Sequence, residues 1–78
     1  MTDLKQLLTD IACSIVENPE DVSVDEREDG ESVVLTLHVA ESDMGKVIGR
    51  HGKNARCIRT VMKAAANCAG KKITVDIE

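Results

Sequence analysis

The most constraining feature of the sequence is a segment, residues 33–39, in which the apolar residues at positions 33, 35, 37 and 39 alternate with Val34, Thr36 and His38. Successive side chains of a β-strand point to opposite faces of its sheet, so this alternation predicts a strand with one buried face. Such a strand needs a packing layer on that face alone. Alternation returns at residues 73–77, and the apolar positions of the two segments are Val33, Leu35, Leu37, Val39, Ile73, Val75 and Ile77.

A β-hairpin is predicted around the first of these segments. Val22 and Val24 alternate with polar neighbours, and the dipeptide Asp29-Gly30 is a turn signal before residue 33. The first strand becomes charged toward the turn, in the run DEREDGE. We expect this run to be a solvated hairpin tip.

Two longer segments place apolar side chains at steps of three and four residues, which predicts amphipathic helices. The first helix has Thr2 as its candidate cap and ends at Asn18-Pro19, and the second begins near Lys53 and ends at Gly70. The predicted apolar positions are Leu4, Leu7, Leu8, Ile11, Ala12, Ile15 and Val16, then Ala55, Ile58, Met62, Ala65 and Ala69.

A third, short helix is predicted between the candidate cap Ser42 and the stop Gly49. The element order is then α-β-β-α-α-β, which predicts an α+β fold with a three-stranded sheet and helices packed on one face. The chain has 78 residues, too few for two cores, so we expect residues 1–78 to form one domain.

Composition excludes several classes of function. The chain has no Phe, Tyr or Trp, so nucleic-acid bases cannot stack on aromatic rings. No run approaches the roughly 18–20 apolar residues of a membrane span, and the charged start is unlike a secretory signal, so we expect a cytoplasmic protein without membrane contact. Cys13, Cys57 and Cys68 form no CxxC pair, which favours reduced thiols over a disulfide or a metal site.

Charge is divided between the two halves of the chain. Residues 1–43 hold two basic and twelve acidic side chains, a formal charge of −10, whereas residues 44–78 hold eight basic and two acidic ones, a charge of +6. A phosphate responds to the local field within about 8–10 Å, so the acidic total does not exclude nucleic acid. An acid-free stretch, residues 45–63, contains Lys46, Arg50, Lys53, Arg56, Arg59 and Lys63.

Gly49 and Gly52 form a Gly-x-x-Gly turn inside this basic stretch. A Walker A loop would need glycine in place of Val47 and Ser or Thr in place of Asn54, and the G-x-G-x-x-G dinucleotide fingerprint also needs glycine at position 47. Neither phosphate loop is present. Glycines at both ends of the turn let two helices meet tightly and let the backbone approach a ligand.

The second predicted helix begins at this turn and offers free N–H groups to an anion beside Arg50, His51 and Lys53. Three further cations recur at steps of three and four along the helix and extend the basic surface away from the turn. This arrangement suits the backbone of a polyanion. The alternative is a helix-turn-helix corner with a solvated basic face.

The stretch VIGRHGK at residues 47–53 resembles the (V/I)IGxxG signature of KH domains, and the element order resembles their type II, bacterial arrangement. Residues 41–66 are also similar to the small, single-domain KhpA (YlqC) family. The resemblance implies that the turn clamps the backbone of about four nucleotides of single-stranded RNA while an aliphatic groove receives the bases. The implied RNA-binding residues are Gly49, Arg50, His51, Gly52, Lys53, Lys46, Arg56 and Arg59, with Ile48, Ala55 and one face of the second strand lining the groove.

The same resemblance implies partners and a cellular role. Members of this bacterial family are described as cytoplasmic RNA chaperones that dimerise and pair with a larger KH-containing protein, KhpB (Jag), with links to cell-wall homeostasis and cell length. No cofactor and no small-molecule substrate are implied. Because the acidic half should repel RNA everywhere but the turn, we expect weak binding with a shallow salt dependence.

The remaining polar residues give no indication of an enzyme. Cys57 and His51 could be imagined as a nucleophile and a base, but no third residue to orient them is suggested, so we expect a non-enzyme in which His51 is a hydrogen-bonding group. His38, on the polar face of the second strand, is expected to be solvated.

One face of the long predicted helix carries small side chains at steps of three and four: Cys57, Val61, Ala64 and Cys68. Such a smooth face allows a second helix to approach closely, which makes it a candidate dimer contact. Burial in the core is the alternative for these residues. For the chain as a whole, the alternative function is a KH-fold scaffold for protein association with incidental nucleic-acid contact.

Overall fold

The computed structural model describes residues 3–78, so the predicted cap Thr2 lies outside the described residues. The first helix, α1, spans Leu4–Ile15, and its N-cap is Asp3, whose side chain accepts a hydrogen bond from the backbone N–H of Gln6 at 3.2 Å. The single-turn helix η1 (Pro19–Asp21) follows α1. The helix therefore ends before the Asn18-Pro19 dipeptide, as predicted.

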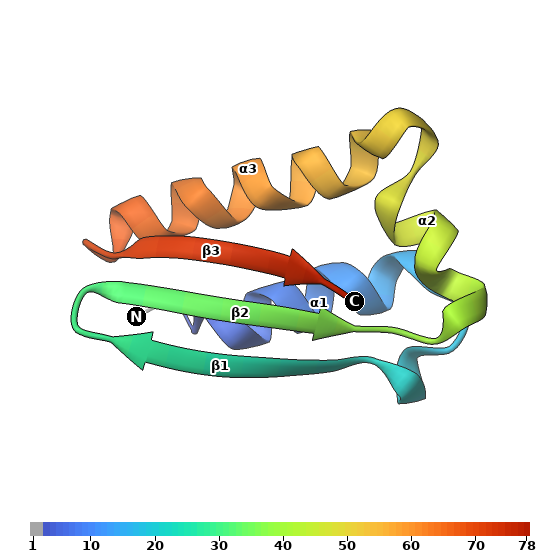
Figure 1. Ribbon diagram of the computed structural model, residues 1–78, viewed down its shortest axis with the longest axis horizontal. Coiled ribbons are helices and arrows are strands. Elements are labelled where there is room, and N and C mark those ends of the chain that lie inside the picture. Colours follow the sequence, from blue (N-terminus) through green and yellow to red (C-terminus); the bar gives the residue numbers. More distant parts are fainter. Residues whose placement is uncertain (1–2) are drawn as a thin grey trace.

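The strands β1 (Ser23–Asp29), β2 (Ser32–His38) and β3 (Lys72–Ile77) form one sheet in the order β1-β2-β3 (Figure 1). β1 and β2 form the predicted antiparallel hairpin, and β3 runs parallel to β2. Asp29 pairs with Ser32, so the turn residues are Gly30 and Glu31, one position later than the predicted dipeptide. Gly30 has a φ of 63°, as the first position of such a two-residue turn requires.

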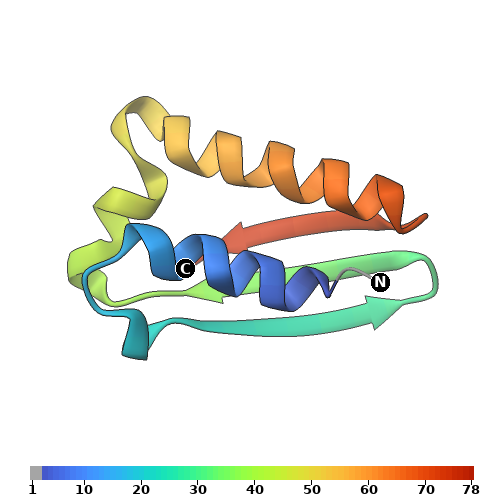
Figure 2. The same cartoon turned by 180° about the vertical axis from the view of Figure 1, so that it is seen from behind.

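The helices α1 and α3 (Lys53–Cys68) cover the same face of the sheet (Figure 2). This arrangement confirms the predicted α+β fold with helices on one face. The alternation in β2 has the predicted effect, because the core-facing Val33, Leu35 and Leu37 are at most 1% exposed. The buried core contains Leu4, Leu8, Ala12, Val24, Val33, Leu35, Leu37, Val47, Ile58, Met62, Ala66 and Val75.

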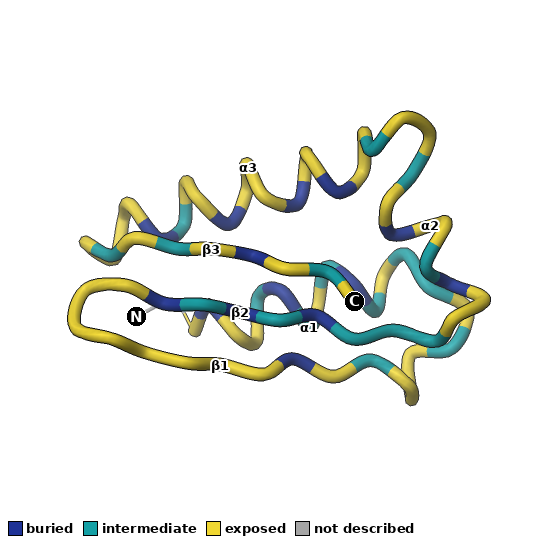
Figure 3. The backbone as a smooth tube through the Cα atoms, in the orientation of Figure 1, coloured by how far each residue is buried: buried dark blue, intermediate teal, exposed yellow. Residues whose placement is uncertain are grey.

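Along α3, the buried positions recur on the side that faces the sheet (Figure 3). After Met62 the next buried residue is Ala66, whereas the sequence predicted Ala65 and Ala69. Ala65 is only partly buried and Ala69 is exposed. Over several turns, the 3.6-residue period carries the sheet-facing side to Ala66, which is also alanine, so composition alone could not separate the two choices.

The short helix α2 (Met44–Ile48) follows the single-turn helix η2 (Glu41–Asp43). Ser42 lies inside η2, so the prediction that Ser42 caps α2 is wrong. Asp43 occupies the N-cap position but makes no capping hydrogen bond with α2.

Asp43 instead holds the start of α2 against the loop after α1. It is 1% exposed and accepts hydrogen bonds from the backbone N–H groups of Glu17 and Asn18, at 3.1 and 3.0 Å, and from Nδ2 of Asn18 at 3.0 Å. Burial alone would raise the pKa of Asp43, but the hydrogen bonds outweigh it, so the pKa lies below its ordinary value. The carboxylate is therefore a fixed link between two segments far apart in the sequence.

Candidate nucleic-acid interface

The Gly-x-x-Gly turn forms the single-turn helix η3 (Arg50–Gly52) between α2 and α3, at one end of the molecule (Figure 1). Gly49, His51 and Gly52 have φ values of 76°, 57° and 74°. Gly49 combines its φ with a ψ of 175°, a conformation that residues other than glycine almost never adopt. His51 is a non-glycine residue in the left-handed region, which histidine enters more readily than most side chains.

The two glycines of the turn are needed for different reasons. A Cβ on Gly49 would lie 2.7 Å from Cγ and 2.9 Å from the backbone nitrogen of Asn54, whereas a Cβ on Gly52 would meet no atom within 4 Å. Gly49 is therefore required by close packing and by backbone conformation. Gly52 is required by its backbone conformation alone, and the space beside its Cα is open.

Cationic side chains surround the turn. Arg50, His51 and Lys53 are all exposed, and Lys53 is the first residue of α3. The 16-residue helix α3 has no acidic side chain in its first turn, so its N-terminal N–H groups keep their attraction for an anion. Backbone donors and cations are thus brought together, in the arrangement that the sequence predicted.

The remaining predicted contacts around the turn differ in the charge or exposed surface that they offer to a ligand. Lys46, exposed on α2, forms an ion pair with Glu17, so its charge is partly offset. Ile48 is 39% exposed and presents a large apolar surface beside the turn. Ala55 is only 6% exposed, so it offers a ligand little surface for the groove role that the resemblance implied.

A surface groove runs beside α3, and β3 forms its wall. Arg59 reaches across this groove, and its Nε donates a hydrogen bond to the carbonyl of Val75 at 3.3 Å. The hollow here has a volume of about 330 Å³ and is lined by Arg59, Lys63, Ile73, Thr74, Val75 and Asp76.

The second strand, which the resemblance gave as a groove wall, does not line this hollow. β2 is the central strand, because β3 enters the sheet on the side opposite β1. The apolar face of β2 is buried under the helices, and its other face points away from them. The strand that lines the hollow is the edge strand β3.

The division of charge along the sequence is kept in space. The acidic strand β1, with the sequence SVDERED, forms the sheet edge opposite β3. The basic helix α3 lies over the β3 side, and its Arg56 and Lys63 are exposed (Figure 1). The acidic strand therefore does not border the groove.

The small-residue face of α3 points to solvent. Cys57, Val61, Ala64 and Cys68 are all exposed, and Val61 is 48% exposed, so the alternative of core burial is wrong. Part of this face adjoins α1 in a shallow hollow of about 260 Å³, lined by Ile11, Ile15, Asn54, Cys57, Ile58 and Val61. The exposed Val61 within this smooth face makes it a candidate for protein contact.

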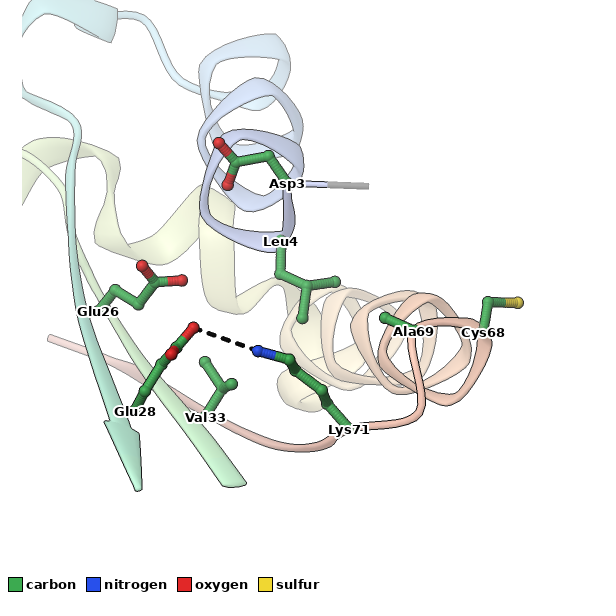
Figure 4. Close-up of a pocket in the computed structure, with 8 residues that line it drawn as sticks. All are labelled: Asp3, Leu4, Glu26, Glu28, Val33, Cys68, Ala69 and Lys71. Atoms are coloured by element: carbon green, nitrogen blue, oxygen red, sulfur yellow. Dashed lines mark hydrogen bonds and ion pairs between the residues drawn. The ribbon is translucent and has the colours of Figure 1, made fainter. Parts of the chain in front are cut away.

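Two features lie away from the turn. His38 is not simply solvated, because its Nε2 lies 3.1 Å from Oδ2 of Asp25 and its Nδ1 lies 3.7 Å from Oε2 of Glu78. A hollow of about 640 Å³ lies at the other end of α3, where Lys71 pairs with Glu28 at 3.2 Å (Figure 4). Its lining carries more acidic than basic side chains, which disfavours a phosphate ligand.

Within residues 3–78, no helix is long and apolar enough to cross a bilayer. The same residues contain no group of three or more His, Cys, Asp or Glu side chains arranged to hold a metal ion.

One residue at the turn, Asn54, was not predicted from the sequence. Nδ2 of Asn54 donates a hydrogen bond to the backbone carbonyl of Lys46 at 2.8 Å, across the turn from α3 to α2. Asn54 entered the sequence analysis only as a mismatch to the Walker A pattern. No local pattern could have marked it, because the contact depends on the angle between two helices.

Comparison with known proteins agrees with this geometry. A family model described as the KhpA/KhpB KH domain matches residues 5–77. The chain is 51% identical over 74 residues to the RNA-binding protein KhpA of Clostridium perfringens (strain 13 / Type A), covering 95% of this chain and 99% of that protein. It is 39% identical over 79 residues to the RNA-binding protein KhpA of Bacillus subtilis (strain 168), covering 99% and 98% respectively. The resemblance drawn from residues 41–66 is confirmed.

A solved structure with a similar fold is Era in complex with MgGDPNP and nucleotides 1506–1542 of 16S ribosomal RNA. The match has a TM-score of 0.68 and 15% sequence identity, and it covers 95% of this chain and 28% of that chain. At this identity the likeness shows the fold alone.

Proposed function

The chain belongs to the KhpA/KhpB family of KH domains, and on that basis we propose that it binds single-stranded RNA through the turn at residues 49–52. KH domains are nucleic-acid-binding modules rather than enzymes, so the prediction of a non-enzyme is confirmed by the family. We further propose that residues 1–78 make up one type II KH domain.

The observation that carries the proposal is the exposed turn, whose cations stand around the N-terminus of α3. An RNA phosphate at this place would meet Arg50, His51 and Lys53 and the positive end of the helix dipole. The next nucleotides would follow the groove between α3 and β3. Their bases would contact Ile48 and the groove wall, with Arg56 and Arg59 beside the backbone, so no aromatic stacking is required.

The test replaces both central residues of the turn, Arg50→Asp with His51→Asp. Two carboxylates at the phosphate position should abolish crosslinking to single-stranded RNA, while both glycines and the fold are left alone. The matched control is Lys5→Asp with Arg27→Asp, which adds at least as much negative charge at exposed positions away from the turn. Crosslinking that survives the turn variant, or that is lost equally in the control, would contradict the proposal.

We propose that the protein acts as a dimer, either with a second copy or with a KhpB-like KH protein, through the exposed face Cys57, Val61, Ala64 and Cys68. The support is the apolar exposure of this face, which is separate from the basic side of α3. Val61→Asp should shift sedimentation toward the monomer, because a charge would be buried in the contact.

Lys63→Asp is the control for the dimer, because two residues along a helix of period 3.6 place it nearly opposite Val61. It should leave sedimentation unchanged. An unaltered oligomeric state in Val61→Asp would remove this face as the contact.

The cellular part of the proposal is that of a cytoplasmic RNA chaperone acting in cell-wall homeostasis and cell length. It rests on similarity to relatives along almost the whole chain. The alternative is a scaffold in which protein association is the main role, and it is favoured by the exposed Val61 face. Complementation of a deletion strain by the Arg50→Asp, His51→Asp variant would favour the scaffold, whereas failure to complement would favour the RNA role.

A further inference from the structure

The helix α2 has only five residues, and its C-terminal carbonyls lack partners further along the helix. Gly49 N–H donates to the carbonyl of Gly45 at 2.8 Å, which satisfies one of them. The carbonyl of Lys46 receives its hydrogen bond from the side chain of Asn54, in the first turn of α3. A side chain of α3 thus caps the C-terminal end of α2.

The hydrogen bond coincides with the tightest packing in the turn. Asn54 lies so close to Gly49 that a Cβ there would overlap its Cγ at 2.7 Å and its Cβ at 2.9 Å. The first glycine of the motif therefore makes room for Asn54 within the protein itself. The same side chain meets the end of α2 by a hydrogen bond and by direct contact.

The other hydrogen bonds of the loop between these helices come from its own backbone, among them Lys53 N–H to the carbonyl of Arg50. Arg50 and His51 are exposed, and a Cβ on Gly52 would touch nothing. Gly52 N–H donates to the carbonyl of Gly49 at 3.2 Å, within the turn. Among residues 3–78, the bond from Asn54 to Lys46 is the one side-chain hydrogen bond that joins α2 to α3.

We infer that Asn54 is a positioning residue for RNA binding, because it ties the two helix ends together and so holds residues 50–52 in the conformation that receives a phosphate. The inference rests on the proposed function and adds a residue that this function does not itself require. Without the tie, the turn would sample other conformations, and the apparent affinity would fall in proportion to the fraction of turns still competent to bind.

The test is Asn54→Ala, with Asn67→Ala as control. Both positions are exposed asparagines on α3, and Asn67 lies near the helix end away from the turn. Alanine favours helix and offsets part of the lost hydrogen bond, so Asn54→Ala should lower the denaturation midpoint only slightly, and Asn67→Ala should not lower it. In Asn54→Ala, the backbone amide order parameters of residues 50–52 in the free protein should fall, and affinity for single-stranded RNA should weaken about fivefold, as for one lost hydrogen bond. Asn67→Ala should match the wild type in both measurements.

The free-protein measurement separates positioning from direct contact with RNA. If Asn54 acted only by touching RNA, the order of the turn in the free variant would be unchanged, and this result would overturn the inference. A looser turn with unchanged affinity would overturn it as well. Failure of the wild-type protein to bind RNA would overturn the proposed function, and the order parameters would still decide whether Asn54 holds the turn.

Discussion

At the scale of single residues, the two glycines of the turn are not equivalent, although the sequence motif treats them alike. Gly49 adopts a conformation reserved for glycine and packs against Asn54, whereas Gly52 is left-handed with open space beside it. The structural requirement is therefore strict at the first glycine and looser at the second.

Gly49→Ala is expected to destabilise the protein by at least about 2 kcal/mol, because backbone strain and steric overlap add. Gly52→Asn is expected to cost less than about 1 kcal/mol, because asparagine tolerates the left-handed conformation. Urea denaturation of both variants checks this difference. Equal losses of stability would contradict a stricter structural requirement at Gly49 than at Gly52.

At the scale of the elements, the position of α2 depends on contacts with parts of the chain distant in sequence. Asp43 joins its start to the loop after α1, and Asn54 joins its end to α3. A five-residue helix has too few internal hydrogen bonds to be stable alone. The turn is therefore presented by a helix that is fixed from both ends.

Asp43→Asn is expected to lower stability at neutral pH, because the carboxylate accepts three hydrogen bonds that an amide cannot reproduce. The pKa of Asp43 is lowered in the folded protein, so its contribution is complete above the ordinary value of 3.8 and is lost as the pH falls through the lower folded value. The stability difference between wild type and variant should thus shrink in acid.

Urea denaturation at about pH 7 and about pH 2.5 measures this change. Asp29→Asn, at the exposed hairpin end, serves as the control and should show no such convergence. A difference for Asp43→Asn that stays constant across this range would contradict the assignment of the carboxylate as the link.

At the scale of the whole molecule, opposite charges occupy opposite sides. The acidic strand β1 lies at one edge of the sheet, and the cations of α3 lie over the other. RNA that followed the groove between α3 and β3 would meet Arg59 and Lys63, with Asp76 as the acidic side chain of the lining, and it would meet repulsion if it extended over β1. The bound length should be short.

The expected consequence is a shallow salt dependence. Three or four neutralised phosphates on a single strand give a slope of log affinity against log salt of about −2 to −3. Titrations at several potassium chloride concentrations measure the slope. A slope near about −7 would imply roughly ten phosphate contacts and would contradict a contact limited to the turn and groove.

Much of the fold could be predicted because the relevant forces are local. The alternation at Val33, Leu35 and Leu37 requires one buried face, and the positive φ of Gly49 and Gly70 matches the helix ends predicted there. The cap of α2 could not be predicted, because Asp43 takes its hydrogen bonds from a loop some 25 residues earlier in the chain.

The sequence by itself determined the order of helices and strands, the single buried face of the sheet, the Gly-x-x-Gly turn and the concentration of positive charge around it. These follow from the spacing of side chains along the chain and from backbone preferences. Only the tertiary structure decided that β3 walls the groove, that the Val61 face is open, and that Asn54 ties the two helices together. Those features depend on which strand reaches the sheet edge and on the angle between helices, which packing of the whole chain sets.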